Sequence, residues 1–254
     1  MELIVPDLVR YGLLCLIVLI TNFQEGVTGF GCTALALPFA VMLVGLDVAK
    51  PVLVMLALVL NGSIVIMSWR KIVWKEYWYI ILFVGIGLPI GMWMGEVLPE
   101  KGLKAVLAVF MTGVGIQGLV NLSRKVAQSE LGKRTKLFVT SFLPLGGVIH
   151  GAFGSGGPLV IVYATRAIGD KGVFRVTLSL VWITLNLILV SSWILRSQIT
   201  PHIQHLALLC LPFTIAGLII GNFAHHRMND YAFKKMVYVV LCFSGVLLLW
   251  SILK

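Results

Sequence analysis

The sequence is divided into apolar stretches whose lengths suit helices that cross a lipid bilayer. Such a helix needs about 20 mostly apolar residues. Hydrophobic residues make up 59% of the chain and charged residues only 12%, against about 25% charged in soluble domains. A polytopic, all-α membrane protein is therefore predicted, and a cytosolic enzyme, a disordered chain and a nucleic-acid-binding protein are excluded. Six stretches without Lys, Arg, Asp or Glu are each expected to form one helix: 51–69, 77–95, 105–123, 176–195, 197–226 and 236–253.

Two further apolar stretches are too long for a single helix. Residues 11–46 are apolar apart from Glu25, and residues 137–165 carry no formal charge apart from His150. We expect each stretch to form two helical pieces joined by unwound backbone, either as two tilted spans or as a re-entrant hairpin. The chain then has about 8–10 membrane segments. The interruptions are predicted at glycine clusters: Gly26, Gly29 and Gly31, and Gly146, Gly147, Gly151, Gly154, Gly156 and Gly157.

The positive charges indicate how the chain is oriented in the bilayer. The formal net charge is +10, and the basic residues lie in short breaks between apolar stretches. With both termini outside, most of the 20 Lys and Arg residues fall in inner loops, as the positive-inside rule requires. The segment Met1–Asp7 has no basic region of the kind that begins a signal peptide. We therefore expect the first apolar stretch to remain in the mature protein.

The two halves of the chain show an internal repeat. We expect a first repeat over 1–123, a cytoplasmic linker over 124–136 and a second repeat over 137–254. Each repeat holds a broken pair and three helices, an odd number of crossings, so the two repeats have inverted topology. In transporters of this kind the substrate binds near the midplane, where discontinuous helices meet. A shift of 125 residues pairs Gly26 with Gly151, Gly29 with Gly154, Gly31 with Gly156, Lys50 with Arg175, and Asn61 with Asn186.

The two breaks are suited to binding a small anion. Irregular backbone at membrane depth is tolerated only where protein buries it or where it lines a watery cavity. The helix after each break presents free N–H groups and a positive dipole end, and hydroxyl groups nearby add donors. The alternative is that the glycines only permit helices to cross closely. The predicted substrate-binding residues at the breaks are Thr28, Gly29, Phe30, Gly31, Cys32, Thr33, Gly154, Ser155, Gly156 and Gly157.

Glu25 and His150 occupy equivalent positions in the two repeats. A titratable group inside a membrane segment is a functional hypothesis by default. Glu25 would take up a proton and couple it to transport, and His150 titrates near physiological pH. The alternatives are a structural hydrogen bond for Glu25 and a satisfied polar core residue for His150. Replacement of Glu25 by Gln distinguishes these roles, because a proton carrier would lose its dependence on a pH gradient.

Two other pairs related by the repeat have alternative interpretations. Lys50 and Arg175 lie at opposite membrane faces in the predicted topology, each just before a long helix. They either attract an anion into a vestibule or act as snorkelling and orientation charges. Asn61 and Asn186 lie in the middle of helices. They either contact the substrate or form interhelical hydrogen bonds, and the second role is the commoner one in lipid.

The two glycine clusters resemble paired motifs of a known family. The segments 28–38 (TGFGCTALALP) and 151–158 (GAFGSGGP) are similar to those of the TauE/SafE family, and the resemblance covers about residues 12–250. Its members are multi-pass, repeat-built membrane proteins, many of them bacterial, regarded as exporters of sulfite and organosulfur anions. Cys32 and Thr33 stand where glycines are frequent in the family. The resemblance implies an exporter of a sulfur oxyanion or an organosulfonate in a bacterial inner membrane.

Two other classes of protein are weighed against a carrier. An intramembrane hydrolase would use Ser155, but His150 lies five residues away on the same segment, which is poor geometry for a base. An uncoupled anion channel would lack saturation and counterflow. The four cysteines show no CxxC spacing, which supports neither a disulfide framework nor a zinc site. No organic cofactor or metal is expected. Gly91 and Gly95 form a small-xxx-small pair, for which internal packing is favoured over contacts in a homodimer.

Overall fold

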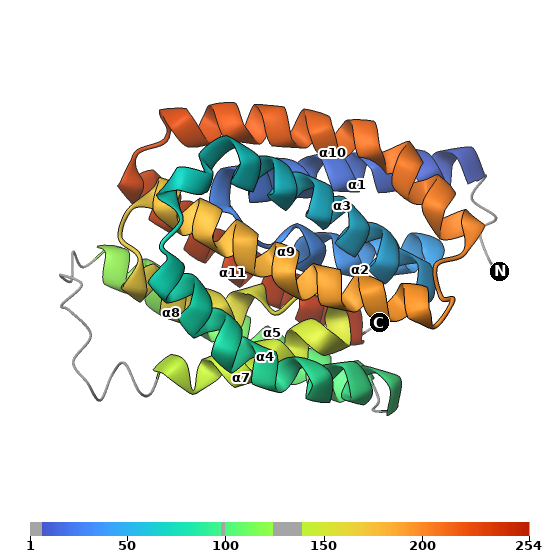
Figure 1. Cartoon of the computed structure of the whole chain (residues 1–254), viewed down its shortest axis with the longest axis horizontal. Helices are drawn as coiled ribbons and strands as arrows, with labels where there is room; N and C mark the ends of the chain where they lie inside the picture. Colours follow the sequence, from blue (N-terminus) through green and yellow to red (C-terminus); the bar gives the residue numbers. More distant parts are fainter. Residues whose placement is uncertain (1–6, 98–99, 124–138, 254) are drawn as a thin grey trace.

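The computed structural model describes residues 7–97, 100–123 and 139–253, and those residues fold as a bundle of helices without a β-strand (Figure 1). The predicted all-α class is confirmed, and each of the six stretches expected to form one helix does so. The predicted linker over 124–136 lies outside the described residues. The elements are α1 (Asp7–Thr28), α2 (Cys32–Val44), α3 (Leu46–Ser68), η1 (Trp69–Lys71), α4 (Trp74–Val97), α5 (Glu100–Ser123), α7 (Phe142–Phe153), α8 (Gly157–Ala167), α9 (Lys171–Leu195), α10 (Pro201–Arg227) and α11 (Asp230–Leu253).

The helices have the length and the surface of membrane spans. Among the described residues, α1, α3 with η1, α4, α9 and α10 are each long and apolar enough to cross a bilayer. Large apolar side chains such as Ile66, Leu82, Leu208 and Ile219 are largely exposed on the outside of the bundle. An apolar surface of this extent is costly in water and suits contact with lipid tails. The chain is therefore a polytopic membrane protein.

Both long apolar stretches are broken in two, as predicted, but only at the end of each glycine cluster. Residues 29–31 separate α1 from α2, and residues 154–156 separate α7 from α8. The helices α2, α7 and α8 have 13, 12 and 11 residues. At 1.5 Å per residue they extend about 16–20 Å, well short of the hydrocarbon core of about 30 Å. The first stretch is thus a full-length helix followed by a shorter one.

Not every glycine of the predicted clusters unwinds the backbone. The glycines that stay helical pack against other helices: a Cβ on Gly26 would lie 3.2 Å from the Cα of Gly221, and Gly147 and Gly151 lie against the backbone of α4. These positions need glycine because two helix backbones approach each other. The alternative stated for the clusters, close helix crossing, therefore applies to Gly26, Gly147 and Gly151, whereas a Cβ on Gly146 would meet the side chains of Leu159 and Val160 at 3.3 Å.

The main helix pairs join one helix from each half of the chain. Helix α1 packs on α10, α7 on α4, α3 on α9 and α5 on α11. Figure 1 shows α1 and α10 along one side and α4 and α7 along the other, with α3 and α9 between them. The predicted repeat relates α1 to α7 and α4 to α10, so the α1–α10 pair corresponds to the α7–α4 pair. It also relates α3 to α9 and α5 to α11, so each of these pairs corresponds to itself. This pairing agrees with two related halves, while the repeat and its inverted topology in the membrane stay predictions.

The small-xxx-small pair on α4 serves internal packing. Gly91 lies against the carbonyl of Val148 on α7, and a Cβ on Gly95 would lie 3.0 Å from the Cα of Ala152. Both glycines therefore face α7 within the same chain. Of the two interpretations of this pair, the contacts support internal packing, although Gly95 also keeps an exposed surface.

Candidate substrate site

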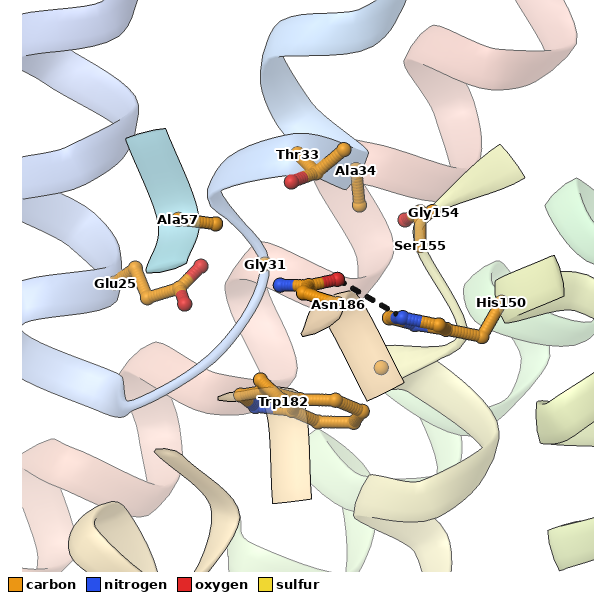
Figure 2. Close-up of a pocket in the computed structure, with 11 residues that line it drawn as sticks. Glu25, Gly31, Thr33, Ala34, Ala57, His150, Gly154, Ser155, Trp182 and Asn186 are labelled. Atoms are coloured by element: carbon orange, nitrogen blue, oxygen red, sulfur yellow. Dashed lines mark hydrogen bonds between the residues drawn. The ribbon is translucent and has the colours of Figure 1, made fainter. Parts of the chain in front are cut away.

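The two breaks face each other across a small cavity between α1, α2, α3, α7, α8 and α9. Its volume is about 30 Å³, room for about two water molecules. Figure 2 shows Glu25 on one side, His150 on the other and Asn186 between them, with Trp182 below. The cavity is lined by Glu25, Gly31, Thr33, Ala34, Ala57, His150, Gly154, Ser155, Gly157, Trp182 and Asn186.

The first break is fixed by two glycines in left-handed conformations. Gly29 has φ +82° and donates its N–H to the carbonyl of Glu25 at 2.6 Å, which ends α1. Gly31 has φ +99° and precedes the first residue of α2. Residues with a Cβ rarely adopt such angles, so the chain can turn this sharply only with glycine. The hydroxyl of Thr28 and the amide of Gln24 bond the backbone of the break and each other, which holds it in shape.

Glu25 is held at this break by two neutral donors. Its side chain is 3% exposed. The N–H of Cys32, the first residue of α2, donates to Oε2 at 2.6 Å, and the side-chain amide of Asn61 on α3 donates to Oε1 at 2.7 Å. Among the described residues no cation lies within ion-pair distance of this carboxyl group. A buried carboxylate without a counter-charge is costly, so this environment suits a group that takes up a proton.

The second break repeats this arrangement around His150. Gly154 has φ +68° and donates its N–H to the carbonyl of His150 at 2.6 Å, as Gly29 does to Glu25. The N–H of Gly156 donates to Nδ1 of His150 at 3.2 Å, which places the ring hydrogen on Nε2, and Nε2 then donates to Oδ1 of Asn186 at 3.0 Å. Glu25 and His150 therefore each bond the asparagine 36 residues further along the chain.

Trp182 links the two breaks. Its ring stacks on the imidazole of His150 with centroids 5.9 Å apart and planes 15° apart. Its indole N–H donates to the carbonyl of Gly29 at 2.9 Å. Trp182 thus connects the end of α1 to the end of α7 through one rigid side chain on α9.

Several groups direct hydrogen-bond donors into the cavity. The amide of Asn186 points its nitrogen away from His150 and toward Glu25 (Figure 2). Thr33 and Ala34 belong to the first turn of α2, and Gly157 begins α8. The N-cap residues Gly31 and Gly156 have no side chain, and the carboxylate of Glu25 accepts only the N–H of Cys32. The first N–H groups of a helix lack intrahelical acceptors. The cavity is therefore rich in donors and has one acidic group, Glu25.

The structure brings part of the predicted site to the cavity. The residues that line it are Glu25, Gly31, Thr33, His150, Gly154, Ser155, Gly157 and Asn186. The others do not line it: Thr28, Gly29, Phe30, Cys32, Gly156 and Asn61, all of which lie in or against the breaks. Asn61 forms the interhelical bond given as its alternative role. The sequence reasoning missed Ala34, Ala57 and Trp182. The repeat relates Ala57 to Trp182, one turn before each asparagine, and that spacing was the available signal.

Lys50 and Arg175 lie outside the central cavity. Nζ of Lys50 donates to the carbonyls of Gly151 and Ala152 at 3.3 and 2.6 Å, at the carboxyl end of α7. It also lines a second cavity of about 310 Å³ beside α3, α4 and α9. Arg175 is 5% exposed and donates from Nη1 to Oδ1 of Asn222 at 2.8 Å. Each base therefore lies at one end of the bundle.

The site shows neither a metal centre nor a serine–histidine pair among the described residues. No group of three or more His, Cys, Asp or Glu side chains is placed to hold a metal ion in that part of the chain. Both ring nitrogens of His150 have partners other than Ser155, namely Gly156 and Asn186. A hydrolase would need one of them as a base for the serine.

A bundle of membrane-length helices around a donor-rich cavity between two helix breaks is the arrangement that membrane transporters with discontinuous helices use. The sequence comparison gives the family: the chain belongs to the sulfite exporter TauE/SafE family, whose sequence profile matches residues 14–248. It is also 24% identical over 193 residues to a probable inner membrane transporter protein, TsaS, of Comamonas testosteroni. The matched region covers 75% of this chain and 77% of that protein. No solved structure matches the chain. The predicted family resemblance is confirmed.

Proposed function

We propose that this protein is a secondary transporter that exports a sulfur oxyanion or an organosulfonate across a bacterial inner membrane. The observation that carries the proposal is the cavity between the two breaks, where helix N-termini, hydroxyl groups and the Asn186 amide converge. The family to which the chain belongs is described as sulfite exporters, which supports both the substrate class and the direction. Both termini lie outside in the proposed orientation.

The donors of the cavity suit the pyramidal head of a sulfite or sulfonate group. Such a group has three oxygens that accept hydrogen bonds in different directions, and the donors come from α2, α8 and α9. Helix N-termini favour negative charge through their dipoles. The volume of about 30 Å³ is smaller than a four-atom anion needs, so the walls must separate slightly when it binds. Rocking of the two halves against each other would open the cavity to one face and then to the other.

Glu25 couples this movement to a proton. Two unit charges about 5 Å apart repel each other by about 3 kcal/mol at an effective dielectric constant near 20. An ionised Glu25 would therefore weaken anion binding by about a hundredfold, and a protonated Glu25 would not. The proton and the anion then travel in the same direction. A dianion with one proton is still negative, so the negative potential inside the cell drives it outward.

Uptake into inside-out vesicles tests the proposal. We expect saturable uptake of labelled sulfite or an organosulfonate, counterflow against unlabelled anion, and stimulation when the outside medium, which corresponds to the cytoplasm, is acidified. The second candidate is an uncoupled anion facilitator, which the neutral partners of Glu25 favour if that group never ionises. Saturable counterflow without any effect of acidification would assign the facilitator. Absence of uptake for every sulfur anion in the panel would exclude both.

A further inference from the structure

Arg175 on α9 is a buried cation with most of its donors unused. Its side chain is 5% exposed, and Nη1 donates to Oδ1 of Asn222 on α10 at 2.8 Å. Nε and Nη2 are buried and have no hydrogen-bond partner. Among the described residues no carboxylate lies within ion-pair distance of this guanidinium group. A buried charge that is neither paired nor fully hydrogen-bonded is costly, and a bound anion would remove that cost.

The two unused nitrogens form one edge of the guanidinium plane. The N–H groups of Nε and Nη2 point in parallel, which allows them to donate to two oxygens of one oxyanion. Nη1, which bonds Asn222, belongs to the other side of the group. The contact with Asn222 therefore fixes the plane and leaves the paired edge available.

A comparison with Lys50, the equivalent residue of the first half, shows that Arg175 does not serve as a helix cap. Lys50 donates to the carbonyls of Gly151 and Ala152 at the carboxyl end of α7. In the other half the corresponding carbonyl, that of Val27 at the end of α1, accepts from Nδ1 of His225 at 2.7 Å. His225 thus performs the role that Lys50 performs at α7. The paired edge of Arg175 has no such structural task.

Arg175 lies on the same face of α9 as two residues of the central cavity. Positions 175, 179, 182 and 186 are spaced by four, three and four residues, which places them on one helix face. Ser179, between Arg175 and Trp182, is fully buried and its hydroxyl has no partner either. The rise from 175 to 182 is about 10 Å. A row of polar groups, of which Arg175 and Ser179 have unused donors, therefore leads from the cavity toward the end of α9 that carries Lys171.

The first break lies directly against this row. A Cβ on Gly29 would come within 2.8 Å of the Cα of Arg175, and the carbonyl of Gly29 accepts the indole N–H of Trp182. Any movement that opens the central cavity past the first break therefore also exposes the guanidinium group of Arg175.

We propose that the Nε and Nη2 edge of Arg175 is a second anion-binding site, which holds a sulfite or sulfonate group on the predicted inner side of the first break. The identity of the anion rests on the proposed function. The site receives the anion from the cytoplasmic side and passes it along the donors of α9 to the central cavity. The same chemistry fits the phosphate of a lipid headgroup, and the experiment distinguishes that ligand from the sulfur anion.

The test is the number of labelled sulfite ions bound to the purified protein, measured by equilibrium dialysis in a detergent without phospholipid. We expect two per chain for the wild type and one for Arg175→Gln. Arg175→Lys keeps the charge without the paired edge, and we expect its second site to be at least tenfold weaker. Arg70→Gln is the matched control, because Arg70 is an exposed arginine of η1 that should leave both sites intact.

Three outcomes would overturn the inference while the proposed function stands. They are one ion bound by the wild type and by Arg175→Gln alike, two ions with unchanged affinities in Arg175→Lys, and a second equivalent that phosphatidylglycerol displaces and excess sulfite does not restore. Binding of no sulfite by the wild type would instead contradict the proposed function. If Arg175→Gln does not fold, Arg175→Lys decides the question.

Discussion

Replacement of Glu25 by Gln separates proton coupling from anion binding. The carboxyl group accepts one hydrogen bond from Cys32 and one from Asn61, at 2.6 and 2.7 Å. Gln keeps one acceptor oxygen for Cys32 and turns an NH2 group toward Asn61. Oδ1 of Asn61 is buried without a partner, so rotation of its amide would provide the new acceptor. The bond from Asn61 to the carbonyl of Ala57 would be lost, at a cost of about 1 kcal/mol.

The functional effect of this variant should be much larger than its effect on stability. Gln imitates protonated Glu at every pH, so the repulsion of about 3 kcal/mol between carboxylate and anion disappears. We expect sulfite counterflow in proteoliposomes to persist, with an apparent affinity about a hundredfold higher at a pH where Glu25 of the wild type is ionised. Stimulation by acid on the loading side should be abolished.

The matched control is Glu76→Gln. Glu76 accepts a hydrogen bond from the hydroxyl of Tyr163 and does not line the cavity. Its replacement should leave both the affinity for sulfite and the stimulation by acid unchanged. If Glu25→Gln retained the stimulation by acid seen in the wild type, Glu25 would not be the proton carrier and the electrostatic reasoning would be refuted.

Three further predictions concern the breaks and the packing around them. Gly154→Ala should destabilise the detergent-solubilised protein by about 1–2 kcal/mol, because the φ angle of Gly154 is +68°. Gly62→Ala should not, because a Cβ at this helical position meets nothing within 4 Å. Thermal unfolding measures the stability of both variants. Gly91→Ala should lower the unfolding temperature by separating two helices, and Gly85→Ala on the same helix should not, because a Cβ there meets nothing within 4 Å. Trp182→Ala should enlarge the cavity and let longer organosulfonates compete better with labelled sulfite for counterflow; an unchanged order of competition would contradict the placement of Trp182.

The helices could be predicted from the sequence because their length and apolar character are local properties. Which glycines unwind could not, because that depends on partners far away in the chain. Gly26 and Gly29 are three residues apart, yet Gly26 stays helical against Gly221 and Gly29 ends the helix against Arg175. The identity of the residue alone therefore does not distinguish a glycine that packs against a neighbouring helix from a glycine at which the chain turns.

The candidate site was predictable to the extent that the repeat is visible. The shift of 125 residues paired Glu25 with His150 and Asn61 with Asn186, and the structure shows the same hydrogen-bond spacing in each half. Trp182 was not predicted because its equivalent in the first half is Ala57, so the pair shares no residue type and only its spacing from the asparagines marked it. Its two contacts, with a ring and a carbonyl on different helices, exist only in the folded chain.

The central claim is that the anion binds between the two breaks, and sulfite counterflow by Asn186→Asp tests it most directly. This variant has the same shape and keeps an acceptor for His150, but it replaces the donor that faces the cavity with a negative oxygen. Asn121→Asp on the exposed end of α5 is the control for an added charge. We predict that Asn186→Asp folds but loses counterflow and that Asn121→Asp transports normally. Wild-type affinity for sulfite in Asn186→Asp would contradict the account.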